Sequence, residues 1–218
     1  MTTVLTRWGH SCVRFERAGS RLVVDPGTFS DRSVLESADA VLVTHEHTDH
    51  VVVEDLMEAI ANRSHLEVWA PSVVIDQLIG DGTTGDRLHR ANAGESFTAA
   101  GFDVLVLGEW HAMIHLDVPR VQNVAYLIDG AVLHPGDSFT PPDAGQSVDV
   151  LLAPVSAPWL KIAEVVDYVR EVGPRVVVPI HDALLSDVGN ALVDRLVSSL
   201  GGADTYCRLG VGESLDIG

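Results

Sequence analysis

Three histidines and an aspartate lie in one hexapeptide that begins one residue after a short apolar run. The hexapeptide spans residues 45–50 and reads His-Glu-His-Thr-Asp-His, and the apolar run before it covers residues 40–43. At this chain's composition, an HxHxDH string arises by chance roughly 0.002 times. Neutral imidazole and carboxylate are ligands that suit zinc, iron or manganese. The hexapeptide therefore predicts a fold in which a buried strand ends at a metal site, and a histidine-rich solvated loop is the minor alternative.

Further candidate ligands follow the ends of other apolar runs. They are His111 after residues 102–107, Asp137 after residues 131–136 and His181 after residues 176–180. In open sheets, functional groups gather at the carboxyl ends of strands, where the chain turns into loops. His115 competes with His111 for the same position, and we favour His111 because it lies closer to its strand. Four strand ends thus each offer a candidate ligand.

The hydrophobic pattern predicts a layered arrangement of strands and helices. Short runs rich in β-branched residues indicate buried strands, and the first 25 residues are typical of a strand meander. Asp129-Gly130 predicts a tight hairpin. Helical patterns cover residues 55–62, 73–79, 160–172 and 184–200, and a polar surface loop is expected over residues 80–86. Meanders combined with helical crossovers favour a sandwich with helices packed outside, and no linker divides residues 1–218, so we expect a single domain.

The charge balance bears on the partners of the chain. The 218 residues carry 14 Lys+Arg against 31 Asp+Glu, which gives a formal net charge of −17. Nucleic-acid binders concentrate basic residues, so nucleic acid is not an expected partner. No uncharged apolar run approaches the ~20 residues that span a bilayer, and the two cysteines do not form a disulfide framework. We expect a cytoplasmic protein that acts on a small molecule away from membranes, and its oligomeric state stays open.

The order of these candidate residues resembles the metallo-β-lactamase superfamily, whose pattern is HxHxDH, a later His, a later Asp and a final His. The resemblance implies an α/β fold, a four-layer αβ/βα sandwich of two mixed β-sheets with helices on the outer faces. Gly9-His10-Ser11 and Val23-Val24-Asp25-Pro26 resemble the branch of small single-domain members that includes ascorbate-6-phosphate lactonase and uncharacterised metal-dependent hydrolases. Residues 153–161 lack the glycine-rich stretch of that branch, so the lactonase substrate does not follow.

The same resemblance implies a ligand set for two divalent ions. Zn²⁺ is the expected metal, with Mn²⁺ or Fe²⁺ as alternatives. The first ion would be held by His45, His47 and His111, and the second by Asp49, His50 and His181, with Asp137 bridging both.

The implied activity is hydrolysis. A metal-bound hydroxide would attack an ester, lactone or phosphodiester bond of a small substrate, and Asp49 would orient this nucleophile. Two other functions remain open at this point. One is a mononuclear iron dioxygenase that acts on a persulfide, and the other is a metal-loaded binding or sensor protein without turnover.

Several residues near the candidate ligands allow two interpretations each. His10 is either a proton donor to the leaving group or a turn histidine. Asp25 either accepts a hydrogen bond from a ligand imidazole or forms a turn. Trp159 and Lys161 either line a substrate pocket or belong to a helix start. A phosphorylated substrate would need local positive charge from the metals, Lys161 or Arg120.

Overall fold

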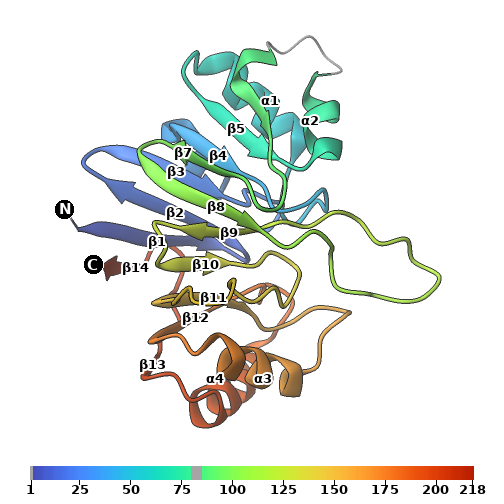
Figure 1. Ribbon diagram of the computed structural model, residues 1–218, viewed down its shortest axis with the longest axis vertical. Coiled ribbons are helices and arrows are strands. Elements are labelled where there is room, and N and C mark those ends of the chain that lie inside the picture. The colour runs from blue at the N-terminus through green and yellow to red at the C-terminus, as the bar shows by residue number, and fades with distance from the viewer. Residues whose placement is uncertain (1, 80–84) are drawn as a thin grey trace.

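Two seven-stranded β-sheets face each other, and a pair of helices covers the outer face of each (Figure 1). The structure is a computed structural model, and it describes residues 2–79 and 85–218. The first sheet has the order β14 (Ser214–Ile217), β1 (Thr3–Gly9), β2 (Cys12–Arg17), β3 (Ser20–Val24), β4 (Ala40–Leu42), β5 (Glu67–Ala70) and β6 (Leu88–Arg90). The second has the order β13 (Thr205–Tyr206), β12 (Val176–Ile180), β11 (Val150–Pro154), β10 (Val132–His134), β9 (Ala125–Ile128), β8 (Phe102–Leu107) and β7 (Ser96–Ala99).

Each α-helix connects two strands that run parallel in a sheet. The four α-helices are α1 (Val53–Asn62), α2 (Ser72–Ile79), α3 (Ile162–Val172) and α4 (Asp187–Leu200), and two 3-10 turns are η1 (Arg32–Ser37) and η2 (Gly85–Arg87). Strands β3 to β6 are parallel, as are β10 to β13, whereas the remaining pairs are antiparallel. Parallel neighbours need crossover connections. The four α-helices supply four of these, η1 lies in the connection from β3 to β4, and the connection from β10 to β11 contains no helix. The carboxyl ends of the parallel strands consequently share one edge of each sheet.

Alternation along the strands divides the core into layers. In β3, Leu22 and Val24 belong to the cluster between the sheets, whereas Val23 packs into the cluster beneath α1 and α2. In β12, Val178 faces the other sheet, whereas Val177 packs into the cluster beneath α3 and α4. Successive side chains of a strand point to opposite faces of the sheet. The result confirms the predicted four-layer αβ/βα sandwich with helices outside.

The four predicted helices are present, and their first residues differ from the prediction. The expected helix over residues 184–200 begins at Asp187, because the Ser186 side chain accepts a hydrogen bond from Gly189 N and caps the helix there. Helix α3 ends as predicted, since Gly173 adopts the left-handed conformation at φ +61°. The loop expected over residues 80–86 falls mostly on residues outside the described ranges. No helix in the described part of the chain is long and apolar enough to cross a bilayer.

Two tight turns with positive φ angles lie at opposite ends of the strands. Asp129 and Gly130 have φ +51° and +62°, and Ala131 N donates to Ile128 O at 3.0 Å, which confirms the predicted tight turn between β9 and β10. Between β1 and β2, Gly9 and His10 have φ +117° and +49°. This turn buries the His10 side chain beside the strand ends that carry the candidate ligands.

Candidate metal centre

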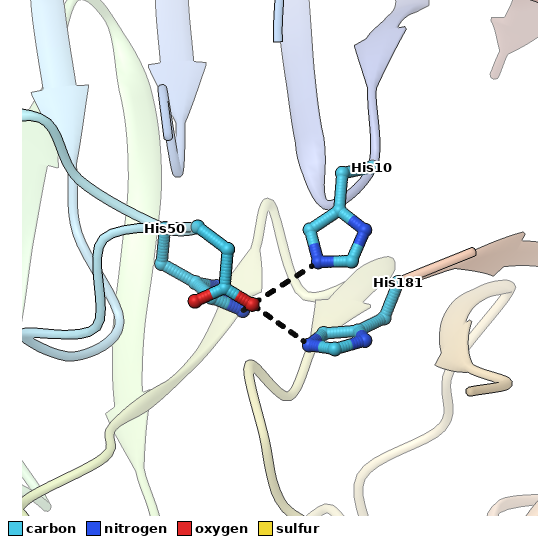
Figure 2. Close-up of side chains that lie close together, drawn as sticks. His10, His50 and His181 are labelled. Atoms are coloured by element: carbon cyan, nitrogen blue, oxygen red, sulfur yellow. Dashed lines mark hydrogen bonds and ion pairs between the residues drawn. The ribbon is translucent and has the colours of Figure 1, made fainter. Parts of the chain in front are cut away.

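Eight histidine and aspartate side chains meet at the shared edge of the two sheets. They form two groups whose ligand atoms lie within 4.8 Å of one another: His45, His47, His111 and Asp137 in one, and His10, Asp49, His50 and His181 in the other. We refer to these as the first and second clusters. Figure 2 shows the rings of His10, His50 and His181, which come from separate segments and point toward one another. The structure thus brings together the seven residues of the ligand set that the resemblance implied, with His10 beside them.

The hexapeptide forms a compact turn that is fixed by backbone hydrogen bonds and by close packing against Gly27. His50 N and Val51 N both donate to His47 O, at 2.9 and 3.0 Å. Gly27 packs against this turn so closely that a Cβ atom there would lie 1.9 Å from Asp49 O. Only glycine permits this approach, because real Cβ contacts are never so short. The position of Asp49 and His50 is therefore fixed by the backbone after β3.

The spacing of the ligand atoms fits metal coordination. Two ligands of one tetrahedral zinc, at about 2.0–2.1 Å from the ion, lie about 3.3 Å apart. His45 Nε2 and His47 Nδ1 are 3.1 Å apart, and His111 Nε2 lies 3.3 Å from Asp137 Oδ2. In the second cluster, His181 Nε2 lies 3.4 Å from Asp49 Oδ2. These separations are those of atoms that share an ion.

Asp137 lies between the two clusters. Its Oδ1 is 3.1 Å from His50 Nε2 and its Oδ2 is 3.2 Å from His181 Nε2, and it also reaches His111. Trp159 Nε1 donates to Asp137 Oδ2 at 3.0 Å, which fixes the carboxylate. The Asp137 carboxylate thus contacts imidazoles from both clusters.

Four of these buried ligand atoms make no hydrogen bond of normal geometry in the described structure, although they lie within 3.3 Å of one another or of Asp137 Oδ2: His50 Nε2, His111 Nε2, His181 Nε2 and Asp137 Oδ1. An unsatisfied buried polar atom costs about 1–3 kcal/mol, so four of them in one place require compensation. Because all four point to the same volume, divalent ions bound there would satisfy them together. The residues therefore fit the metals that the sequence implied.

The outer nitrogens of the imidazoles are held by a hydrogen-bond chain centred on Asp25. His50 Nδ1 donates to Asp25 Oδ2 at 2.6 Å, and Thr44 donates to the same carboxylate from its amide and its hydroxyl, at 2.8 and 2.7 Å. His45 Nδ1 lies 3.0 Å from Thr44 Oγ1. The bond between His50 and Asp25 confirms the expected hydrogen bond between Asp25 and a candidate ligand. Because the outer nitrogens of His45 and His50 make these contacts, the inner nitrogens of both rings are free to bind metal.

Main-chain carbonyls orient the rings of His111 and His181. His111 Nδ1 donates to Ala112 O at 2.6 Å, and His181 Nδ1 donates to Ser156 O. Their Nε2 atoms therefore face the clusters without a proton when the rings are neutral.

His10 is buried and is not a solvent-exposed turn residue. Its Nδ1 accepts from Ala183 N at 3.2 Å, and its Nε2 lies 3.3 Å from Asp49 Oδ2. Because one ring nitrogen accepts, the neutral ring carries its proton on Nε2, and burial lowers the His10 pKa, so that the ring stays neutral. His10 therefore donates a hydrogen bond to Asp49.

Burial and opposite charge act in opposing directions on the remaining groups. Burial lowers the pKa of His45 and His47, which keeps these rings neutral. Burial alone would lower the pKa of His181, but its contacts with Asp137 and Asp49 raise that pKa to about 9. Burial likewise opposes ionisation of Asp137, yet the surrounding imidazoles, His50 foremost, hold its pKa well below the usual range.

The remaining sequence candidates, His115, Trp159 and Lys161, differ in whether they contact the two clusters. The His115 side chain is 65% exposed and lies outside both clusters, so His111 is the histidine that this loop contributes. Trp159 contacts the site through Asp137, whereas Lys161 is 83% exposed and precedes α3, which matches a helix-start residue. Sequence reasoning did not find Thr44 and Ser156, because ordinary polar residues carry no spacing signal.

Comparison with known proteins agrees with this geometry. Residues 4–181 match the family model described as a β-lactamase superfamily domain. The chain belongs to the metallo-β-lactamase superfamily. This superfamily member is 37% identical over 188 residues to Protein Rv0786c of Mycobacterium tuberculosis, a match that covers 84% of this chain and 85% of the relative.

Two further similarities of this metallo-β-lactamase superfamily chain concern a relative and a solved structure. It is 29% identical over 191 residues to a UPF0173 metal-dependent hydrolase of Geobacillus thermodenitrificans, covering 79% of this chain and 82% of the relative. Its fold matches Igni18, a metallo hydrolase from Ignicoccus hospitalis, with a TM-score of 0.75 and 23% identity over 100% of this chain and 99% of that one.

Proposed function

We propose that this chain is a metal-dependent hydrolase of a small substrate and that both clusters bind a divalent ion, zinc first among the candidates. His45, His47 and His111 would hold one ion, Asp49, His50 and His181 the other, and Asp137 would bridge them. The observation that carries this proposal is the convergence around Asp137 of four buried ligand atoms that make no hydrogen bond of normal geometry. The relatives named as metal-dependent hydrolases support the reaction class.

The scissile bond in this proposal is an ester, lactone or phosphodiester. Bound divalent ions would acidify a water molecule towards a pKa of about 7 and polarise the bond under attack. The protein groups then orient the reactants. Asp49 Oδ2 lies within 3.4 Å of both His10 Nε2 and His181 Nε2, at the inner surface of the second cluster, and there it would accept a hydrogen bond from the attacking water.

His10 supplies the matching donor. Its Nδ1 is occupied by Ala183 N, so its proton stays on Nε2, at 3.3 Å from Asp49. After a small rotation of the carboxylate, the same N–H would donate a hydrogen bond to a leaving oxygen and stabilise the charge that develops there. His10 would thus hold Asp49 in place and assist departure of the leaving group without giving up its own proton.

Hydrolysis by matched variants tests the proposal. Protein loaded with two equivalents of Zn²⁺ or Mn²⁺ should hydrolyse p-nitrophenyl acetate, a small lactone or bis-(p-nitrophenyl) phosphate. His47→Ala should lower kcat/KM by about 1,000-fold, which corresponds to about 4 kcal/mol of transition-state stabilisation. His65→Ala is the control, since the His65 side chain is 60% exposed and outside both clusters.

Three outcomes would contradict the proposal. Loaded protein that turns over none of these substrates would indicate a metal-loaded binding or sensor protein. One iron per chain with oxygen consumption on a persulfide would indicate a dioxygenase. Equal rates for His47→Ala and the unaltered protein would show that the clusters do not carry the activity.

A further inference from the structure

The candidate metal centre is divided between the two sheets. His10 and the hexapeptide follow strands of the first sheet, whereas His111, Asp137 and His181 follow strands of the second. His50 Nε2 and Asp137 Oδ1 lie 3.1 Å apart although they belong to different sheets. The spacing of the ligand atoms therefore depends on the contacts that hold the two sheets together at this edge.

His134 is a polar side chain inside the core at this edge. It is the last residue of β10, it is fully buried, and it belongs to neither cluster. Val132 of the same strand packs into the cluster between the sheets, whereas Leu133 packs into the cluster beneath α3 and α4. Because side chains alternate along a strand, the His134 ring points between the sheets, toward the first sheet.

Both ring nitrogens of His134 bond to main-chain groups, one on each sheet. Nδ1 accepts from Gly136 N at 3.2 Å, one residue before Asp137. A neutral ring that accepts at Nδ1 carries its proton on Nε2, and this N–H donates to Ser11 O at 2.9 Å, one residue after His10. Burial lowers the pKa of His134, so the ring stays neutral and keeps this arrangement.

The two turns that His134 joins both contain residues with left-handed backbone. Gly136 has φ +59° and His10 has φ +49°. His10 is not glycine, so its conformation costs free energy and persists only where surrounding contacts hold it. The bond from His134 to Ser11 O is one of these contacts, and the bond from Gly136 N to His134 secures the other turn.

We propose that His134 is a positioning residue that ties the turn carrying Asp137 to the turn carrying His10. This proposal rests on the hydrolase function above. Through Nδ1, the ring fixes the carboxylate that would bridge the two ions. Through Nε2, it fixes the histidine that would stabilise the leaving oxygen. The ring acts only through these two turns.

Two amide variants separate the two bonds. In His134→Asn, the short side chain places its oxygen about where Nδ1 lies, so it can accept from Gly136 N but does not reach Ser11 O. In His134→Gln, the longer side chain places its NH₂ group about where Nε2 lies, so it can donate to Ser11 O but does not accept from Gly136 N. Each variant therefore keeps one of the two turns fixed and releases the other.

The two variants should lose different properties. His134→Gln should bind zinc about tenfold more weakly in a chelator competition, because the turn that carries Asp137 is released. His134→Asn should keep its zinc affinity. At saturating zinc, its ratio of kcat for a p-nitrophenyl ester to kcat for the matching phenyl ester should rise about tenfold, since phenolate is the poorer leaving group and depends more on His10. This ratio should stay unchanged in His134→Gln.

Two readouts do not depend on turnover. Amide hydrogen exchange of the metal-free protein reports local opening, so Gly136 N–H should exchange faster only in His134→Gln. Ala183 N–H, which donates to His10 Nδ1, should exchange faster only in His134→Asn. In the unaltered protein, the ¹⁵N chemical shifts of the His134 ring should show the proton on Nε2, and a proton on Nδ1 would overturn the proposal even if neither variant folds.

The control variant is Ile75→Val, because Ile75 is buried beneath α2 in the cluster away from both turns. It should lower the Tm and leave the zinc affinity and the kcat ratio unchanged, so that a general loss of stability is separated from a loss of positioning.

The outcomes separate this proposal from the hydrolase function. Equal changes of zinc affinity and of the kcat ratio in both variants, or no change in either, would overturn the proposal while hydrolysis stands. If the unaltered, zinc-loaded protein hydrolyses neither ester, the hydrolase function fails. Opposite changes of amide exchange in the two variants, with weaker zinc binding by His134→Gln alone, would then still support His134 as the link between the two turns.

Discussion

Replacing Asp25 with Asn exchanges a hydrogen-bond acceptor for a donor at the most deeply buried support of the metal centre. Asp25 is fully buried, and its Oδ2 accepts from His50 Nδ1 at 2.6 Å. Its φ of +52° is one that Asn tolerates, so the backbone can keep its conformation. The Asn oxygen can still accept from Thr44 N, but the amide nitrogen cannot accept from His50.

His50 must then change its tautomer in Asp25→Asn. The new amide donates to His50 Nδ1, which places the imidazole proton on Nε2, the atom that faces Asp137 at 3.1 Å. A protonated nitrogen does not bind metal. Loss of such an outer partner lowers metal affinity 10- to 100-fold, which corresponds to about 1.4–2.7 kcal/mol.

The measurement is a zinc competition titration against a chromophoric chelator at neutral pH, with thermal unfolding of the metal-free protein alongside. Asp103→Asn is the matched control, because Asp103 is an exposed strand residue outside both clusters. The control should keep full affinity. If Asp25→Asn binds zinc within a factor of two of the unaltered protein, either the tautomer argument or the place of His50 in the site is wrong.

Two further predictions concern stability. Removal of metal by a chelator should lower the Tm, because an ion at 100 times its Kd stabilises the folded protein by about 2.7 kcal/mol. For a chain of this size, this free energy is equivalent to about 5–10 °C in Tm. Calorimetry that shows no shift of the Tm on chelation, and none when zinc is returned, would count against bound metal. Asp194 accepts from Tyr206 and Arg208, and although burial opposes its ionisation, these contacts lower its pKa. Because the folded pKa lies below the unfolded one, its contribution is present above about pH 4 and is lost as the pH falls through the folded pKa. Asp194→Asn should therefore lower the free energy of unfolding by about 1 kcal/mol at pH 7 and by much less at pH 3, and a urea titration with equal differences at both values would contradict this.

The sequence predicts the sandwich and the ligand positions for the same reason. Parallel strands end at one edge, so residues that directly follow such strands meet in space even when they lie far apart along the chain. This is why the hexapeptide, Asp137 and His181 could be expected near one another from their positions after strands, whereas their division between two ions is what the resemblance to the superfamily implied.

The supporting contacts could not be predicted in this way. Thr44 reaches Asp25, and Trp159 reaches Asp137, only through tertiary packing. The two chain segments that pair at the base of the His111 loop also carry no clear hydrophobic alternation. Their pairing nevertheless decides that His111 faces the site and that Arg120 lies beside it.

The two ways of orienting the imidazoles differ in how easily mutation can undo them. His111 and His181 are held by peptide oxygens of Ala112 and Ser156, and a peptide oxygen persists whatever amino acid occupies the position. His45 and His50 instead depend on the side chains of Thr44 and Asp25, which one codon change can erase. Inactivating variants that spare the ligands themselves should accordingly accumulate around the hexapeptide, while the opposite sheet tolerates exchange at its orienting positions.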